Sequence, residues 1–259
     1  LASVLLVTLA CGGDDATATP APTPTTIPTA VPAPTAARVP AAAPDYSSIT
    51  EELSRLIQGV LEESGITGLS VALVDDQEMV WSEGFGYADK ENGVKATRQT
   101  VYGVASVSKL FTATAIMQLA ESGEIDIDQP LQTYIPEFSI NSRFTGSGPI
   151  TLRNVMTHHS GLPSDLLNGM AVIGENEVSL TEGAFDELVQ QFGGSYVATP
   201  PNTVFSYSNL GYALLGHAVT QSSGQDFIEY VDEAILRPLG MNSSSFTITP
   251  EIEQVRSKE

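Results

Sequence analysis

The stretch Val104-Ala-Ser-Val-Ser-Lys-Leu110 places a hydroxyl nucleophile and an amine three residues apart. The largely apolar residues that follow predict a helix over residues 106–122, with Ser106 and Lys109 one turn apart on the same face. At a helix start, unpaired backbone N–H groups and the positive end of the helix dipole stabilise a developing negative charge. A lysine acts as a base in its neutral form, which burial favours. The pair therefore predicts an activated serine, although chance also produces this spacing.

A second polar group, in Phe205-Ser-Tyr-Ser-Asn-Leu-Gly211, lies far along the chain from the first. The hydroxyl of Tyr207 can relay protons when a nearby cation favours its ionised form. The side-chain amide of Asn209 both donates and accepts hydrogen bonds, which suits the amide or ester group of a substrate. On its own this Tyr-x-Asn pattern is as unspecific as the Ser–Lys pair.

A third segment, Thr157-His-His-Ser-Gly-Leu-Pro163, carries two of the three histidines. A histidine here could serve as a catalytic base. The favoured interpretation is a helix C-terminus, with His158 and His159 near the negative end of the helix dipole and Gly161 as the cap.

In this order, the three segments resemble the serine beta-lactamase-related family, which includes class C beta-lactamases, DD-peptidases and related esterases. Residues 102–113 resemble its Ser-x-x-Lys motif, residues 157–163 its Leu-Thr-His-x-Ser-Gly-Leu-Pro segment, and residues 201–216 its Tyr-x-Asn motif with the following helix. Residues 239–241 resemble the family's segment that follows this helix. The resemblance implies that Ser106 forms an acyl-enzyme, with its backbone N–H as one oxyanion donor. It further implies that Lys109 is the general base, Tyr207 relays protons and Asn209 binds the substrate carbonyl.

The sequence departs from the family pattern in two places. Asn202 stands where the family usually has glycine, and asparagine tolerates the left-handed conformation that this turn needs. The family's third motif, Lys/His-x-Gly on a strand that lines the site, is not found before Glu259. We therefore expect a sequence truncated at both ends, without the C-terminal strands of the sheet and inactive by itself, with apolar helix faces left exposed.

The order of the expected elements predicts an α+β protein with helices packed on an antiparallel sheet. The resemblance implies the beta-lactamase/transpeptidase-like class, an antiparallel sheet flanked by helices plus an all-helical region. Gly65 is the expected stop of the first helix, Asp75–Glu78 the turn of a hairpin, and ordered structure begins near Asp45. We expect helices over residues 48–63, 106–122, 152–158, 181–192, 209–222 and 226–236, and strands over residues 69–74, 79–87 and 100–104.

Composition excludes several classes of function. The chain has 11 basic and 31 acidic residues, a net charge of −20, which would repel a nucleic-acid backbone. With one cysteine and three histidines, neither a disulfide framework nor a zinc site is expected. We expect no metal and no other cofactor. The resemblance implies that the partner is a small molecule or peptide with an amide or ester bond.

The first 45 residues are expected to export and tether the domain. Residues 1–10 resemble the end of a signal peptide, and Cys11 after Thr-Leu-Ala resembles the lipidation site of bacterial lipoproteins. Residues 11–45, rich in Pro, Thr and Ala, predict a disordered linker, because they bury too little apolar surface to offset the entropy of ordering. A domain over residues 46–259 would then lie outside the cytoplasm, anchored to the bacterial membrane. The alternative at the N-terminus is an ordinary signal peptide with a free cysteine.

Two classes of function remain open from the sequence. The first is a serine hydrolase that acts through an acyl-enzyme on amide or ester bonds, as beta-lactamases, D-Ala-D-Ala carboxypeptidases and esterases do. The second is a non-catalytic cell-envelope binding protein that keeps the same scaffold. The resemblance alone does not give the substrate, because the shape of the pocket sets it.

Overall fold

The computed structural model describes residues 44–164 and 184–258. The chain divides into two units, residues 1–45 and 46–259, and the elements described here belong to the second. The predicted signal-peptide remnant, the linker and Cys11 lie outside the described residues, as do residues 181–183 at the start of one predicted helix.

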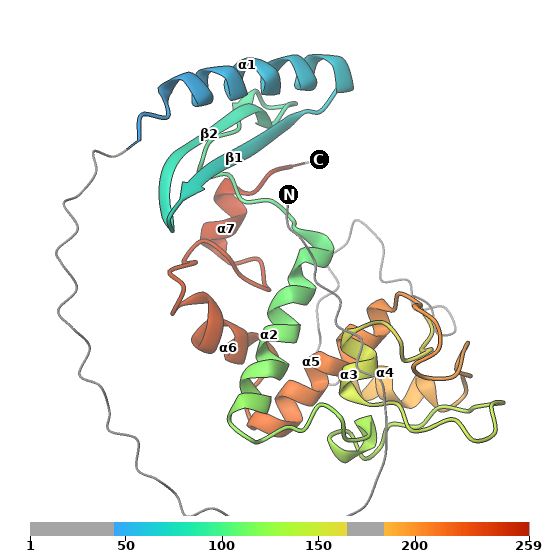
Figure 1. Cartoon of the computed structure of the whole chain (residues 1–259). Helices are drawn as coiled ribbons and strands as arrows, with labels where there is room; N and C mark the ends of the chain where they lie inside the picture. The colour runs from blue at the N-terminus through green and yellow to red at the C-terminus, as the bar shows by residue number, and fades with distance from the viewer. Residues whose placement is uncertain (1–43, 165–183, 259) are drawn as a thin grey trace, which may run out of the picture. The chain divides into compact units, whose positions relative to one another are not determined.

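The first elements are a helix and a hairpin that lie side by side (Figure 1). Helix α1 (Ser47–Ser64) ends at Gly65, whose φ of 68° provides the left-handed cap that glycine adopts without strain. Strands β1 (Gly68–Asp75) and β2 (Glu78–Asp89) pair in antiparallel register. Asp76 and Gln77 both have positive φ, as the two-residue turn of a tightly twisted hairpin requires. The predicted helix, turn and hairpin are confirmed.

The third predicted strand is wrong. The third strand of the sheet is the short β3 (Val94–Lys95), which pairs with β2 and gives the order β1-β2-β3. Within residues 100–104, Val101 makes only an isolated parallel bridge to Arg256. The β-forming side chains of this stretch misled the prediction, because a turn closed by Thr97 and Thr100 precedes it and a positive φ at Ala105 ends it.

The remaining described elements are helical, as the sequence predicted. A 3-10 turn (Ala105–Val107) leads into α2, so the predicted helix over residues 106–122 begins as a tighter turn. Helix α6 continues directly into a π-helical turn (Asp232–Leu236). A short helix over residues 250–255 was not predicted. The helices are α2 (Ser108–Glu121), α3 (Leu152–Met156), α4 (Ala184–Phe192), α5 (Asn209–Ser223), α6 (Phe227–Val231) and α7 (Pro250–Val255), with a 3-10 turn at Leu131–Thr133.

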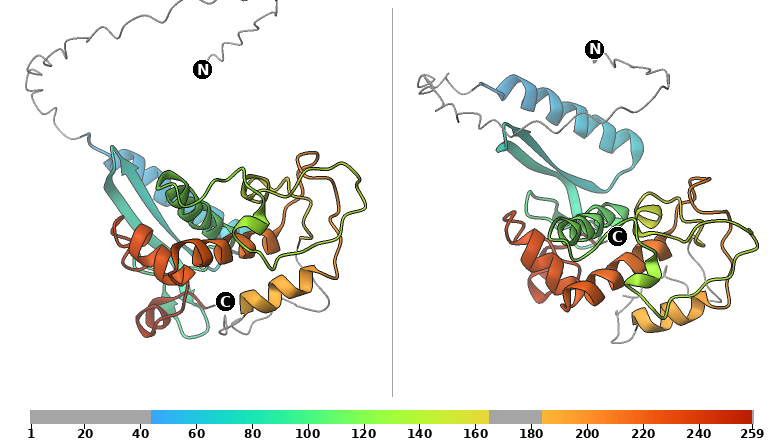
Figure 2. Two further views of the ribbon diagram at one scale, coloured as in Figure 1. Left: turned by 90° about the horizontal axis from the view of Figure 1, so that it is seen from below. Right: turned by 60° about the horizontal axis from the view of Figure 1, so that its bottom comes forward.

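The apolar core lies among the helices and is centred on α5. Figure 2 shows how these helices are arranged. Helix α5 packs against α2, α3, α4 and α6. Eight of its residues are buried, and Leu214, Leu215, Ala218 and Val219 have no exposed surface. Burial of one such leucine contributes about 1.5–3 kcal/mol. The core therefore fixes the position of the N-terminus of α5, which closely follows Tyr207.

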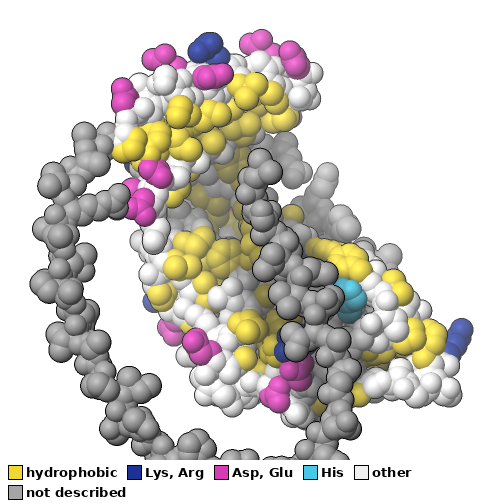
Figure 3. Space-filling model, in the orientation of Figure 1, with side chains coloured by type: hydrophobic (Ala, Val, Ile, Leu, Met, Phe, Trp, Pro, Cys, Tyr) yellow, Lys and Arg dark blue, Asp and Glu magenta, His cyan; other side chains and the backbone are white. Residues whose placement is uncertain are grey.

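Helix α1 differs from α5 because none of its 18 residues is buried. Leu56 is 62% exposed and Ile49 is 48% exposed. Figure 3 shows hydrophobic side chains along the side of α1 that borders the hairpin. Among the described residues, no helix has the length and apolar character needed to cross a bilayer.

Candidate active site

Ser106 lies in the middle of the 3-10 turn that leads into α2. The preceding residue, Ala105, has a φ of 44°, in the left-handed region that alanine rarely adopts. This sharp change of direction turns the chain from the segment at Val101 into the helix and leaves Ser106 exposed. Ser106 is therefore presented on a strained turn at the N-terminal end of the helical segment, and such strain is often found at functional sites.

Three of the predicted site residues meet at one atom. Lys109 Nζ lies 3.0 Å from Ser106 Oγ, and Tyr207 Oη donates to the same oxygen at 2.8 Å. The ammonium of Lys109 also lies 5.0 Å from the centre of the Tyr207 ring, a distance at which the ring face attracts a cation. Tyr207 comes from 101 residues further along the chain. The serine hydroxyl is thus within proton-transfer distance of two groups that can exchange protons with it.

Backbone hydrogen bonds hold the loop before Tyr207 against the segment that follows α3. Asn202 N donates to His159 O at 2.9 Å, and Ala198 N donates to Gly161 O at 2.8 Å. Closest to the site, Ser206 N donates to His158 O at 2.7 Å. The two segments singled out in the sequence are therefore one structural unit, which positions the Tyr207 side chain over Ser106.

The segment after α3 is a helix C-terminus, but its cap differs from the one expected. His158, with a φ of 58°, takes the left-handed cap position that the sequence suggested for Gly161. His158 N donates to Val155 O and His159 N donates to Asn154 O, the two hydrogen bonds of a Schellman motif. Gly161 also has positive φ, and a Cβ there would lie 2.1 Å from Thr199 O. The glycine is needed for a close backbone approach beyond the helix end.

The imidazole of His158 is buried among aromatic rings beside the site. Its centre lies 4.2 Å from that of Tyr207, at an interplanar angle of 31°, and 5.1 Å from that of Tyr212. Burial, followed by the charge of Lys109 and that of His159, lowers the pKa of His158 from its ordinary value. Burial and then Tyr207 raise the pKa of Tyr212.

The two asparagines of the loop occupy different positions. Asn202 adopts the left-handed conformation expected of it, with a φ of 64°, and its Oδ1 accepts from Asn154 Nδ2 at 2.7 Å. Asn209 is the first residue of α5, and its backbone N–H donates to Ser164 O at 2.9 Å. It lies two residues after Tyr207 and is exposed.

The ring stack of His158, Tyr207 and Tyr212 was not predicted from the sequence. There His158 was considered only as a base or as a helix end, and Tyr212 only as a helix residue. No spacing rule joins these rings, because His158 comes from a different segment of the chain. A histidine at a position that favours glycine is the one local signal, and it becomes visible only when the helix end is known.

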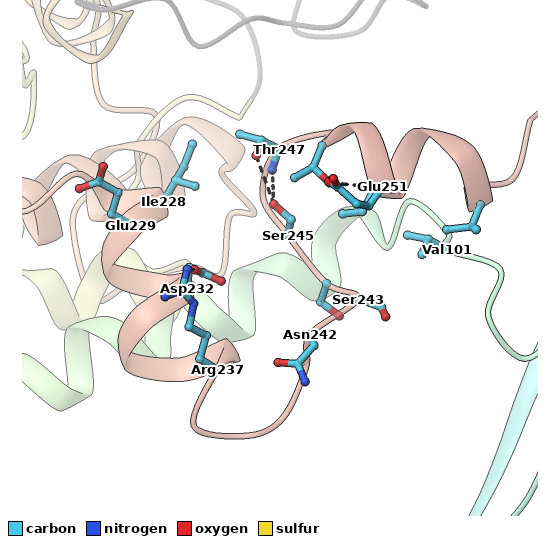
Figure 4. A pocket seen from close by; sticks show the side chains of 14 residues that line it. Val101, Ile228, Glu229, Asp232, Arg237, Asn242, Ser243, Ser245, Thr247 and Glu251 are labelled. Atoms are coloured by element: carbon cyan, nitrogen blue, oxygen red, sulfur yellow. Dashed lines mark hydrogen bonds and ion pairs between the residues drawn. The ribbon is translucent and has the colours of Figure 1, made fainter.

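A pocket of the helical region lies apart from these residues (Figure 4). It has a volume of ≈ 500 Å³ and lies between the α6 region and α7, with Asp232 paired to Arg237 in its wall. It contains neither Ser106, Lys109 nor Tyr207. Within the described ranges, no cluster of three or more His, Cys, Asp or Glu side chains could hold a metal ion. The chemistry available at Ser106 is nucleophilic attack assisted by proton transfer between side chains.

Comparison with known proteins finds relatives in both sequence and structure. The chain is 29% identical over 200 residues to Protein flp of Staphylococcus aureus strain N315, covering 77% of this chain and 39% of that protein. The chain thus spans well under half the length of that relative. A penicillin-binding protein homologue from Pyrococcus abyssi, described as octameric, matches with a TM-score of 0.65 and 32% identity over 80% of this chain and 47% of that chain.

A beta-lactamase/D-alanine carboxypeptidase from Yersinia pestis matches with a TM-score of 0.70 and 25% identity, over 83% of this chain and 60% of that one. These matches agree with the α+β architecture seen here. The family model named Beta-lactamase matches residues 53–257, which include the whole of the site described above. The chain therefore belongs to the beta-lactamase family.

Proposed function

We propose that the protein is a serine hydrolase that forms an acyl-enzyme at Ser106. The observation that carries this proposal is the meeting of Lys109 Nζ and Tyr207 Oη at Ser106 Oγ, at 3.0 Å and 2.8 Å. A lone serine hydroxyl is a weak nucleophile, and a positioned base within hydrogen-bond distance activates it. Family membership supports the same assignment, because the matched region includes both motifs.

In the proposed reaction, Ser106 Oγ attacks the carbonyl carbon of the substrate, and its proton passes to Lys109, whose ammonium has first released a proton to the solvent. The backbone N–H of Ser106, as the family resemblance implies, donates to the oxyanion that forms. When the tetrahedral intermediate collapses, the bond to the leaving group breaks and Tyr207 delivers a proton to that group. A water molecule then attacks the ester by the reverse relay, which releases the acid and regenerates Ser106.

The proposed substrates are small molecules or peptides with an amide or ester bond. The Yersinia pestis relative is described as a beta-lactamase and a D-alanine carboxypeptidase, and both reactions proceed at a carbonyl carbon. Asn209, close to Tyr207 in the chain, is proposed to hold the substrate carbonyl with its amide. We further propose that the protein works outside the cytoplasm, attached to the membrane through a lipid on Cys11.

Covalent labelling of the full-length protein tests the assignment of Ser106. A fluorophosphonate and a fluorescent penicillin are each incubated with the wild type, Ser106→Ala and Ser108→Ala, and the modified peptide is identified by mass spectrometry. Ser108 is a matched control, because it lies on the same turn and touches neither Lys109 nor Tyr207 in any hydrogen bond described. We expect label on Ser106 in the wild type and in Ser108→Ala, with none in Ser106→Ala.

A folded wild-type protein that takes up neither probe would contradict the proposal. That outcome would favour the second hypothesis from the sequence, a non-catalytic binding protein on the same scaffold. Circular dichroism of each variant checks that loss of label does not result from unfolding.

A further inference from the structure

We propose that His158 is a positioning residue, which holds the Tyr207 side chain in contact with Ser106 through its ring and its backbone. This inference rests on the proposed function, since it concerns the efficiency of the same site. It differs from the two roles weighed from the sequence, in which His158 was either the catalytic base itself or a plain helix end.

The backbone of His158 provides the first argument. The residue occupies the left-handed position of a Schellman motif, with a φ of 58°. Glycine takes this position without steric cost, whereas a residue with a Cβ is strained there. A histidine at this point weakens the helix end. A strained residue that persists beside a candidate active site points to a role for its side chain.

The contacts of His158 provide the second argument, because they lie on both sides of Tyr207. Its carbonyl oxygen accepts from Ser206 N at 2.7 Å, and its ring Nδ1 accepts from Ser208 N at 3.2 Å. Between these two hydrogen bonds, the imidazole lies against the Tyr207 ring with the centres 4.2 Å apart. The residues before and after Tyr207, and Tyr207 itself, are thus all held by one residue.

The protonation state of the imidazole follows from the same contacts. Nδ1 can accept from Ser208 N only when it carries no proton, so the ring is neutral with its proton on Nε2. Burial, Lys109 and His159 all lower the pKa of His158, which favours this neutral form. The other titratable groups facing the ring are Tyr207 and Tyr212. Protonation would remove the acceptor and place a second cation near Lys109.

Two substitutions separate a positioning role from a purely structural one. His158→Gly relieves the left-handed strain and removes both the ring and Nδ1. His158→Asn also suits the left-handed backbone, and its Oδ1 can accept from Ser208 N where Nδ1 does, although the ring contact is lost. His159→Asn is the matched control, because its ring contacts Phe205 and the backbone of Thr157 rather than Tyr207.

The measurement is the rate at which a fluorophosphonate modifies Ser106 in the full-length protein, resolved into its maximal rate and its half-saturating concentration. We expect His158→Gly to lower the maximal rate by about tenfold to a hundredfold, as misplacement of a catalytic group does, with little change in the half-saturating concentration. His158→Asn should recover part of this loss, and His159→Asn should match the wild type. The thermal midpoint of each variant is measured alongside, because relief of the left-handed strain in His158→Gly is opposed by loss of the buried ring contacts and of the acceptor for Ser208 N, and labelling is compared at a temperature where every variant is folded.

A double-mutant cycle with Tyr207→Phe tests whether His158 acts through the tyrosine hydroxyl. In the Tyr207→Phe background, His158→Gly should cause no further loss of rate. The wild type should also lose rate as the pH falls through the acid side of neutrality, and His158→Asn should lack this limb of the profile.

Wild-type labelling of Ser106 together with an unchanged rate in His158→Gly would overturn the positioning role while leaving the proposed function intact. The positioning role would also be overturned if His158→Gly lowered the labelling rate in the Tyr207→Phe background as much as it does in the wild type. Absence of label on wild-type Ser106 is the separate result that contradicts the proposed function.

Discussion

Three residues other than glycine adopt left-handed backbone conformations next to the candidate site. They are Ala105, His158 and Asn202, with φ of 44°, 58° and 64°. Ala105 directly precedes Ser106. His158 and Asn202 lie in the two hydrogen-bonded segments that position Tyr207. A residue with a Cβ in this region costs about 1–2 kcal/mol, less for asparagine. The fold therefore sustains strain where the site is assembled.

Gly161 marks the point at which this unit has no room for a side chain. We expect Gly161→Ala to destabilise the protein by about 3 kcal/mol or more, because left-handed strain adds to a contact of 2.1 Å between the new Cβ and Thr199 O. Gly93→Ala is the control, since Gly93 has a φ of 71° and open space where a Cβ would lie. It should cost only about 1 kcal/mol. Urea unfolding midpoints measure both, and equal losses would contradict the steric argument.

At the scale of single residues, the sequence singled out Ser106, Lys109 and Tyr207, whose side chains meet in the structure, but not the rings around them. Ser106 and Lys109 lie at a fixed spacing on one helical segment, so their proximity follows from local geometry. That Tyr207 reaches Ser106 could be expected only from the family resemblance, because the contact spans 101 residues. The stack of His158 on Tyr207 could not be predicted, since it depends on how two loops pack together.

At the scale of elements, the N-terminus of α5 connects the core to the site. Its N-cap is Ser208, a buried residue whose Oγ accepts from Gly211 N at 2.9 Å and donates to Pro163 O at 2.6 Å. The Ser208 hydroxyl therefore lies at the junction between the loop that carries Tyr207 and α5, the helix with the most buried residues. It also ties that junction to the segment after α3.

We expect Ser208→Ala to lower stability by about 2–3 kcal/mol, because the helix loses its cap and the Pro163 carbonyl loses a buried donor. Asp226→Ala removes the N-cap of α6, where the carboxylate accepts from Ile228 N at an exposed position, and should cost about 1 kcal/mol. Ser208→Ala should also slow the labelling of Ser106, whereas Asp226→Ala should not. Denaturation curves and labelling rates report the two effects, and equal labelling in both variants would contradict the link to the site.

The sequence predicted the long helices correctly but misjudged two short segments, the stretch around Val101 and helix α7. The amphipathic pattern predicted α1 and the apolar runs predicted α2 and α5, since these helices are long enough for the period to be clear. The stretch around Val101 has strand-forming residues, but only Val101 pairs, with the single residue Arg256. The stretch therefore forms an isolated bridge rather than a strand. Helix α7 was missed despite its Thr249 cap and Pro250 at the first position, a recognised start signal.

At the scale of the whole molecule, we predict that a lipid attaches the protein to the membrane through Cys11, the one cysteine of the sequence. The full-length precursor, expressed in a bacterial host with radioactive palmitate, should incorporate label and sediment with membranes. Cys11→Ser should abolish both, because lipidation requires the thiol. Ser106→Ala should remain labelled and membrane-bound. Release of the wild type into the soluble fraction, without palmitate, would leave an ordinary signal peptide as the explanation.

The bridge at Val101 has a consequence for synthesis on the ribosome. Val101 N donates to Val255 O at 3.0 Å and Ser257 N donates to Val101 O at 2.8 Å, just before the turn that presents Ser106. A nascent chain can form the hairpin early, since its contacts are local, but this support for the nucleophile must wait until residue 257 has emerged. Translation therefore delays this support for Ser106 until well after the hairpin can form.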